Sequence, residues 1–93
     1  MALLKADGVD IERTLACLRT LVAVITDHAR IEVLGPTPAP LARRARRHRC
    51  QTALIANDRI TLGAALDAII AAHGQSRFPG VRWSIDVDPY DMF

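Results

Sequence analysis

The sequence predicts one small α+β domain whose strands and helices follow one another in the order β-α-β-β-α-β. Two segments repeat hydrophobic residues at spacings of three and four, which is typical of amphipathic helices. A third segment alternates strictly between hydrophobic and polar residues, as a strand with one covered face does. The 93 residues, 51% of them hydrophobic and 24% charged, suffice for one globular core and are too few for several.

The chain begins with a predicted strand and a predicted helix. Residues 3–6 form a short hydrophobic strand, which the turn pair Asp7-Gly8 ends. Acidic side chains, Asp10 among them, then suit the start of a helix because they complement its dipole. We expect this helix to span about residues 9–28, because one face carries the hydrophobic residues Ile11, Leu15, Leu18, Val22 and Ile25.

A second strand, a connector and a third strand come next. Residues 30–34 alternate between polar and hydrophobic side chains and predict a strand. Residues 35–40 hold three prolines within five positions, so we expect a stiff connector without regular structure. An arginine-rich run then leads into residues 50–56, which have strand character.

The remainder predicts a second helix and a last strand. Thr61 is the predicted N-cap and Gly74 the residue just beyond the helix. One face of this helix carries Leu62, Ala65, Leu66, Ile69 and Ile70. His73 falls in the last turn, where a basic side chain suits the dipole. The strand over residues 81–88 is the clearest element, with Val81, Trp83, Ile85 and Val87 alternating with polar residues.

Two right-handed β-α-β units joined in this way give a ferredoxin-like fold. Its four-stranded antiparallel sheet has the spatial order 4-1-3-2, with both helices on one face. In that order the strand at residues 3–6 is central, although it is short and lies close to residue 1. We therefore expect residues 1–93 to be a single domain cut from a larger protein.

The basic residues are concentrated in one short segment. The formal net charge is only +2, and the segments before and after this run are each slightly acidic. Arginines lie within seven positions that contain no acid: Arg43, Arg44, Arg46, Arg47 and Arg49. Such confined basicity is typical of a local anion-binding patch, and guanidinium groups bind phosphate well. A solvated charged loop is the competing interpretation.

Strand periodicity predicts which of these side chains face outward. Arg47, Arg49 and Gln51 would share one face, and His48, Cys50 and Thr52 would point toward the helices. Trp83 lies on the hydrophobic side of its strand, so we expect it in the core. RNA-recognition sheets stack bases on strand aromatics that face outward, and the one aromatic residue in a predicted strand of this chain, Trp83, faces inward. Binding to the nucleic-acid backbone is therefore the better prediction.

Other chemistry receives little support. Asp86, Asp88 and Asp91 could suggest a metal site, but no further oxygen ligand lies nearby, so we expect neither metal nor cofactor. No nucleophile motif or glycine-rich phosphate loop occurs, which predicts a non-catalytic domain. Cys17 and Cys50 are isolated, as in a reduced cytoplasmic protein. The longest hydrophobic stretch is far short of the ~20 residues of a membrane span.

Three segments in this order resemble the end of the PriA family, the primosomal proteins that restart stalled replication forks. They are residues 33–40 (VLGPTPAP), 47–51 (RHRCQ) and 81–89 (VRWSIDVDP). The resemblance spans essentially the whole chain, and it implies a ferredoxin-like C-terminal domain that grips single-stranded or branched DNA. The parent proteins resemble ATP-dependent helicases, whose motor lobes are not in this chain.

The resemblance also implies a second function in a different class. The segment that includes Arg47, Arg49 and Gln51 would dock the acidic C-terminal tail of single-stranded DNA-binding protein, since a cation and an amide suit a terminal carboxylate. Many relatives have an aromatic residue where this chain has His48 and Cys50. A small-molecule regulatory domain of the same plan is a third interpretation, which lacks the expected glycine-rich loop.

Overall fold

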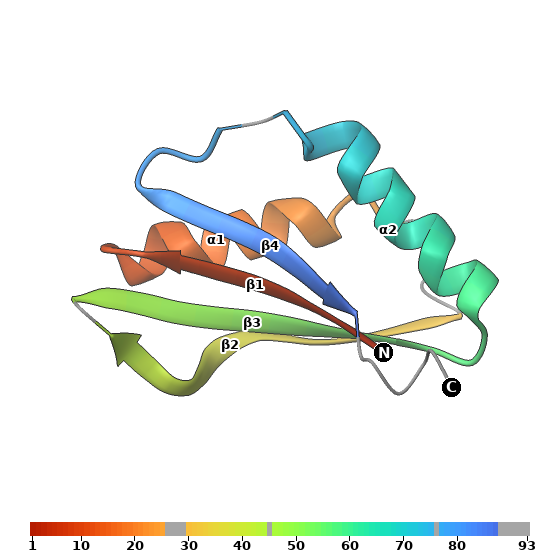
Figure 1. Ribbon diagram of the computed structural model, residues 1–93, viewed down its shortest axis with the longest axis horizontal. Helices are drawn as coiled ribbons and strands as arrows, with labels where there is room; N and C mark the ends of the chain where they lie inside the picture. The colour runs from red at the N-terminus through yellow and green to blue at the C-terminus, as the bar shows by residue number, and fades with distance from the viewer. Residues whose placement is uncertain (26–29, 45, 76, 88–93) are drawn as a thin grey trace.

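The computed structural model describes residues 1–25, 30–44, 46–75 and 77–87 of the chain. The strands and helices follow one another in the predicted order (Figure 1). Their bounds are β1 Ala2–Gly8, α1 Ile11–Val22, β2 Ile31–Arg44, β3 Arg47–Ala56, α2 Arg59–His73 and β4 Val81–Val87. The α+β class and the β-α-β-β-α-β order predicted from the sequence are confirmed.

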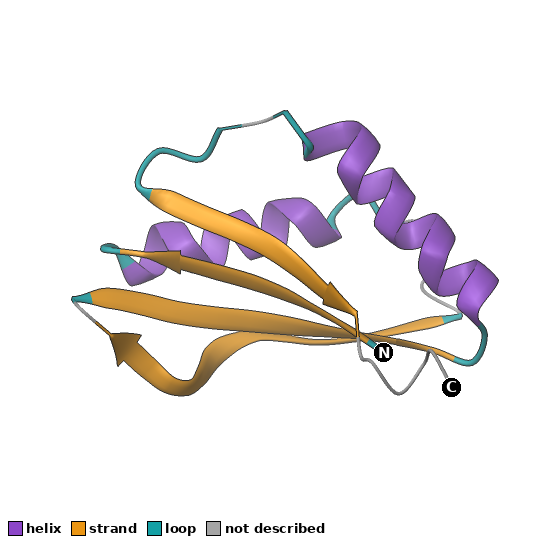
Figure 2. Cartoon of the chain, viewed as in Figure 1, coloured by secondary structure: helices purple, strands orange, loops and turns teal. Residues whose placement is uncertain are grey.

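The four strands form one antiparallel sheet in the order β2-β3-β1-β4. This is the predicted order 4-1-3-2, counted from the opposite edge. Both helices lie on the same side of the sheet, as predicted, and leave the other side uncovered (Figure 2). β1 and β3 are therefore the central strands, and β2 and β4 are the edges.

The core lies between the sheet and the helices. Alternate residues of β1 and β3 point into it, including Leu4 and Leu54, which are fully buried. The two helices add the buried side chains Cys17, Leu18, Leu21, Leu62, Ala65 and Ile69. Cys17 and Cys50 are free and buried, and burial raises the pKa of the Cys17 thiol to about 11. The prediction that both cysteines are buried and unpaired is confirmed.

α1 is shorter than predicted. Asp10 is its N-cap, and the carboxylate accepts hydrogen bonds from the backbone N–H groups of Glu12 and Arg13. The helix ends at Val22 with Ala23 as C-cap, although the hydrophobic spacing continues to Ile25. Periodicity alone therefore overestimated the helix at its end, and residues 26–28 of the prediction lie outside the described residues.

α2 begins three residues earlier than predicted. Its N-cap is Asp58, whose carboxylate accepts hydrogen bonds from the backbone N–H of Thr61 at 2.7 Å and from the Thr61 hydroxyl at 2.9 Å. Aspartate is as good a cap as threonine and here takes the role predicted for Thr61. His73 ends the helix, as predicted, and Gly74 is its C-cap in a right-handed conformation.

The proline-rich segment is part of a strand, so its prediction as a connector was wrong. β2 runs through it, and its pairing with β3 shifts twice, between Leu34 and Thr37 and between Pro38 and Arg43. Gly35, with a φ of 104°, takes the first shift in a conformation that favours glycine. Because β2 is an edge strand, one side of its backbone needs no partner, and prolines are tolerated there.

One polar atom in the core lacks a hydrogen-bond partner. Thr52 is completely buried on β3, and its hydroxyl finds no partner among the described residues. Thr14 is equally buried, but its hydroxyl donates to the carbonyl oxygen of Asp10 at 2.8 Å. A buried polar group without a partner loses its hydration and gains nothing in return.

We predict that Thr52→Val, which keeps the side-chain shape, raises the free energy of unfolding by about 1 kcal/mol. Thr14→Val is the matched control, and it should lower that free energy by a similar amount because it removes a formed hydrogen bond. Urea denaturation of the two variants measures both effects. Equal destabilisation by both substitutions would show that the Thr52 hydroxyl is satisfied in solution.

Candidate nucleic-acid interface

The uncovered side of the sheet carries a group of charged and polar side chains, which we call the outer face. Its position follows from the strand alternation: residues on β1, β3 and β4 that lie opposite one another in register share a side. The outer face consists of Lys5, Asp7, Arg47, Arg49, Gln51, Arg82, Ser84 and Asp86. Four basic and two acidic side chains leave it with a net positive charge.

The arginine run does not enter one strand but straddles a hairpin. Arg43 and Arg44 lie at the end of β2, opposite His48 and Arg47 of β3. Arg46, which lies between the two strands in the sequence, is exposed and has a φ of 66°, and a positive φ is uncommon for a residue other than glycine. The predicted contacts of the Arg43 and Arg44 side chains lie outside what the structure describes.

The predicted direction of the strand side chains holds for β3. Cys50 and Thr52 are buried beneath the helices. Arg49 and Gln51, which alternate with them, lie on the outer face and are partly exposed. Trp83 lies on the helix side of β4 as predicted and packs against the core while remaining partly exposed.

Asp7 ties two arginines of neighbouring strands together. Its carboxylate accepts hydrogen bonds from Nε of Arg47 at 2.8 Å, and from Nε and Nη2 of Arg82 at 3.0 and 3.1 Å. Arg47 also donates to the backbone carbonyl of Asp7 at 3.0 Å. β3, β1 and β4 are thus joined at one end of the sheet through one carboxylate. Arg47, predicted to point freely into solvent, is instead neutralised within the fold.

The electrostatics of this cluster favour a charged Asp7. Partial burial acts to raise the pKa of Asp7, but hydrogen bonds from Arg82 and Arg47 outweigh it and hold the pKa below the ordinary value of 3.8. The same hydrogen bond raises the pKa of Arg82. Asp7 therefore remains an anion at any pH at which the domain would meet its partners.

Arg49 is the basic residue at the centre of the outer face. It lies directly opposite Asp7 in register, yet the Asp7 hydrogen bonds go to Arg47 and Arg82. Within the described ranges, no carboxylate lies within ion-pair distance of Arg49. Lys5 contacts Asp86, with Nζ 2.9 Å from Oδ2, in a pair that is largely exposed to solvent. The guanidinium of Arg49 is therefore available to an external anion. Lys5 can leave its weak, exposed ion pair with Asp86 for an external anion that binds it more strongly.

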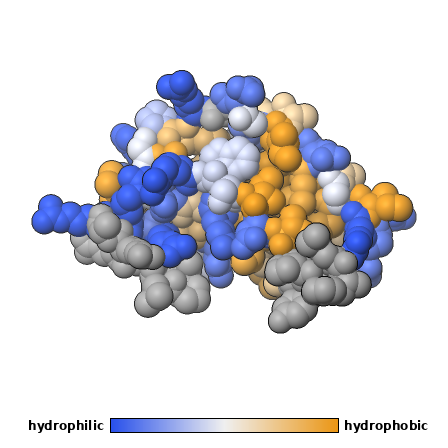
Figure 3. All heavy atoms as spheres, viewed as in Figure 1, coloured by the Kyte–Doolittle hydropathy of each residue, from blue (hydrophilic) through white to orange (hydrophobic). Residues whose placement is uncertain are grey.

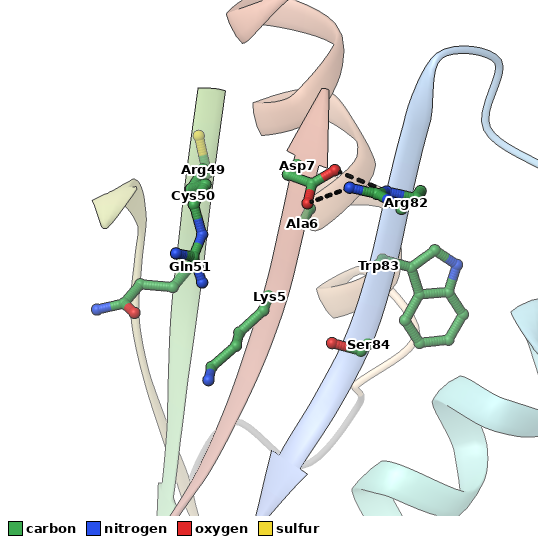
Figure 4. A pocket seen from close by; sticks show the side chains of 9 residues that line it. All are labelled: Lys5, Ala6, Asp7, Arg49, Cys50, Gln51, Arg82, Trp83 and Ser84. Carbon is green, nitrogen blue, oxygen red and sulfur yellow. Dashed lines mark hydrogen bonds and ion pairs between the residues drawn. The ribbon is translucent and has the colours of Figure 1, made fainter. Parts of the chain in front are cut away.

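A hollow of about 340 Å³ lies over this part of the sheet. Its polar lining is formed by Lys5, Asp7, Arg49, Gln51, Arg82 and Ser84. Figure 4 shows Lys5, Gln51 and Ser84 pointing to one side of the strands, and the indole of Trp83 turned to the other, toward α2. The hollow thus combines cations, an amide and a hydroxyl, a set of donors that suits phosphate or carboxylate oxygens.

Metal binding finds no support in the residues that the structure describes. Those residues contain no group of three or more His, Cys, Asp or Glu side chains that could hold an ion. Asp86 is engaged with Lys5, and Asp88 and Asp91 lie outside the described residues. Likewise, no helix within the described ranges has the length and hydrophobicity needed to cross a membrane.

Sequence reasoning missed Lys5, Asp7 and Arg82 as members of the site. The strand alternation marked Arg82 as outward-facing, but only the strand order reveals that it lies beside Asp7. Asp7 was assigned to a turn, whereas β1 continues through it to Gly8. A Cβ at Gly8 would lie 2.6 Å from Oγ1 of Thr14, so glycine is needed there for close packing.

The fold and the outer face together define a small α+β domain with an uncovered, cationic sheet surface. The chain belongs to the family of primosomal protein N C-terminal domains, whose family model matches residues 1–90. It is therefore the C-terminal domain of a primosomal replication restart protein, which confirms the resemblance seen in the sequence. Among curated proteins, none matches this chain.

We predict that Asp7→Asn lowers the free energy of unfolding by about 1 kcal/mol at neutral pH, because charge-assisted hydrogen bonds become neutral ones. The folded-state pKa of Asp7 lies below 3.8, so this contribution is present above that pH and is lost as the pH falls through the folded value. Stability curves of the two proteins should therefore converge in acid.

Denaturation at a series of pH values measures this convergence. Asp67→Asn, on the exposed side of α2, is the matched control and should change stability little at any pH. A difference between the native chain and Asp7→Asn that persists undiminished in strong acid would contradict the assignment.

Proposed function

We propose that the domain grips the backbone of single-stranded or branched DNA with its outer face and its β2–β3 hairpin. The observation that carries this proposal is the guanidinium of Arg49, which has no carboxylate partner among the described residues and faces outward from the central strand β3 beside Lys5 and Gln51. Arg46 adds an exposed cation at the hairpin. Basic groups arranged in this way attract phosphates and gain further from the release of counterions.

The proposed contact is with phosphates and not with bases. Sheets that read single strands stack bases on aromatic side chains, whereas the outer face, as described, presents charged, amide and hydroxyl groups. Trp83 is on the opposite side of the sheet, toward α2 (Figure 4). Such a surface supports binding that depends strongly on salt and little on sequence.

The five arginines contribute unequally in this proposal. Arg49 and Arg46 are available to DNA, and Arg43 and Arg44 stand next to them in the hairpin. Arg47 has the positioning role, since its guanidinium is held by Asp7. Lys5 and Arg82 extend the cationic surface across β1 and β4.

A second candidate function is docking the acidic tail of single-stranded DNA-binding protein. The observation that favours it is the hollow of about 340 Å³ beside Arg49 and Gln51, which has room for a terminal carboxylate together with part of the residue that carries it. A guanidinium and an amide together can bind both oxygens of a chain terminus. Because Arg47 is tied to Asp7, Arg49 is the better anchor for such a tail than Arg47.

The wider setting is proposed from the family. We place the domain beside the helicase lobes of a longer, cytoplasmic restart protein, where it would hold DNA while the lobes carry out any ATP hydrolysis. The free, buried thiols of Cys17 and Cys50 suit a reducing compartment. The domain itself is proposed to be non-catalytic.

We predict that the affinity for single-stranded DNA falls steeply with salt. The logarithm of the association constant against the logarithm of the salt concentration should have a slope of about −3 if about four phosphates are contacted. Arg49→Ala should reduce the magnitude of that slope by about 0.7, the contribution of one phosphate contact on a single strand. The control variant is Arg19→Ala, which removes an exposed charge on α1, across the sheet, and should leave the slope unchanged. If the affinity of the native chain did not change with salt, binding through phosphate contacts would be contradicted.

We also predict that the two candidate functions separate by variant. Arg46→Gly removes a cation and relieves the positive φ, so DNA affinity should fall severalfold with no loss of stability, while tail-peptide binding is retained. Gln51→Ala should weaken the tail peptide more than DNA. Fluorescence anisotropy with labelled DNA and labelled peptide measures both, and parallel losses in the two variants would show that one common site serves both ligands.

A further inference from the structure

The two edges of the sheet differ in how they resist pairing with another strand. β2 carries prolines and two register shifts along its length, and both features prevent a further strand from adding. β4 pairs with β1 residue for residue over Val81–Val87, without a shift, and contains no proline. Its other side has no strand partner in the described sheet. β4 is therefore a regular edge that lacks the prolines and register shifts of β2.

Hydrophobic side chains flank this edge on the helix side. Figure 3 shows them gathered between β4 and α2 on the face of the molecule turned to the viewer. Val87 of β4 is 45% exposed and Ile70 of α2 is 52% exposed. Trp83 and Ile85 are only partly buried. The open edge and an adjoining hydrophobic margin together are typical of a surface that a further strand covers.

We propose that the occupant is β4 of a second copy of this chain, paired antiparallel about Ser84. Ser84 is the midpoint of Val81–Val87, so this register alone pairs all seven residues of both strands. It places Trp83 opposite Ile85 of the second copy on the helix side. On the outer face, it places Arg82 opposite Asp86 of the second copy, and this pair occurs twice because the arrangement is two-fold symmetric.

The charges are free to make these contacts. The Arg82 side chain is 73% exposed and the Asp86 side chain 55%. Arg82 uses Nε and Nη2 toward Asp7, and Asp86 uses Oδ2 toward Lys5. Nη1 of Arg82 and Oδ1 of Asp86 can therefore join across the interface while the bonds within each copy stay in place. Opposite charges directly across neighbouring strands are stabilising.

The pairing would produce one continuous eight-stranded sheet. The two-fold axis between antiparallel strands is perpendicular to the sheet, so the helices of both copies lie on one side and both outer faces lie on the other. The cationic surfaces would then adjoin across the β4 strands. This inference concerns assembly and does not depend on which anion the outer face binds.

The test exploits the symmetry of the proposed register. In a dimer of Arg82→Glu, each cross-strand pair consists of two carboxylates, and in a dimer of Asp86→Arg each consists of two guanidinium groups. Each variant alone should therefore self-associate at least about tenfold more weakly than the native chain. When the two variants are mixed, each cross-strand pair of the mixed dimer joins one carboxylate to one guanidinium group, so mixing should restore association.

The double variant that carries both Arg82→Glu and Asp86→Arg exchanges the two charges and makes both cross-strand pairs complementary again. Sedimentation equilibrium without DNA should show that it associates nearly as well as the native chain, although it lacks the native contacts of Arg82 with Asp7 and of Asp86 with Lys5. A double variant that associates no more strongly than either single variant overturns the proposed register.

A control variant and a fluorescence measurement test the same interface independently. Glu32→Arg reverses an exposed charge on β2, the opposite edge, and should leave association unchanged. Trp83 is the single tryptophan of the chain, so its fluorescence should shift to the blue as the native chain associates with rising concentration. The proposal is overturned if the native chain stays monomeric at every concentration. That result is expected if the β4 edge pairs instead with a strand of another protein.

Discussion

The contact on which the outer face depends is the carboxylate of Asp7 held between Arg47 and Arg82. Without it, cations on three adjacent strands would stand together, since Arg49 and Arg82 are both directly opposite position 7. Like charges facing one another across strands are destabilising. One acid on the central strand thus permits a dense basic surface, and it also decides which arginine remains available.

The sequence predicted the fold well because its strongest signals are local. The alternation at Val81–Val87 and the periodic helix faces need no tertiary information, and the chain order of the elements then leaves few topologies. The proline-rich segment was wrongly predicted to be a connector because a strand tolerates proline mainly where it is an edge of the sheet. Edge position is a property of the finished sheet, so residues 35–40 could not be interpreted before the strand order was known.

The candidate site was predictable in composition and direction but not in pairing. Strand parity placed Arg49 and Gln51 outward and Cys50 and Thr52 inward. It could not reveal that Arg47 has a carboxylate partner forty positions away in the chain. An ion pair between strands depends on register, and a single-residue slip would have moved Asp7 to the other face. Charge runs therefore identify a region, whereas the available charges within it are set by the fold.

β4 connects the anion-binding surface to the proposed assembly. Its outward residues, Arg82 and Asp86, take part in the charge network of the outer face, while its inward residues, such as Trp83, complete one side of the core. The open edge between these two sets is long enough to add a strand and lacks the devices that protect β2. A domain that needed only to bind an anion would gain from protecting both edges. The contrast between them is best explained if the unprotected one is covered when the protein works.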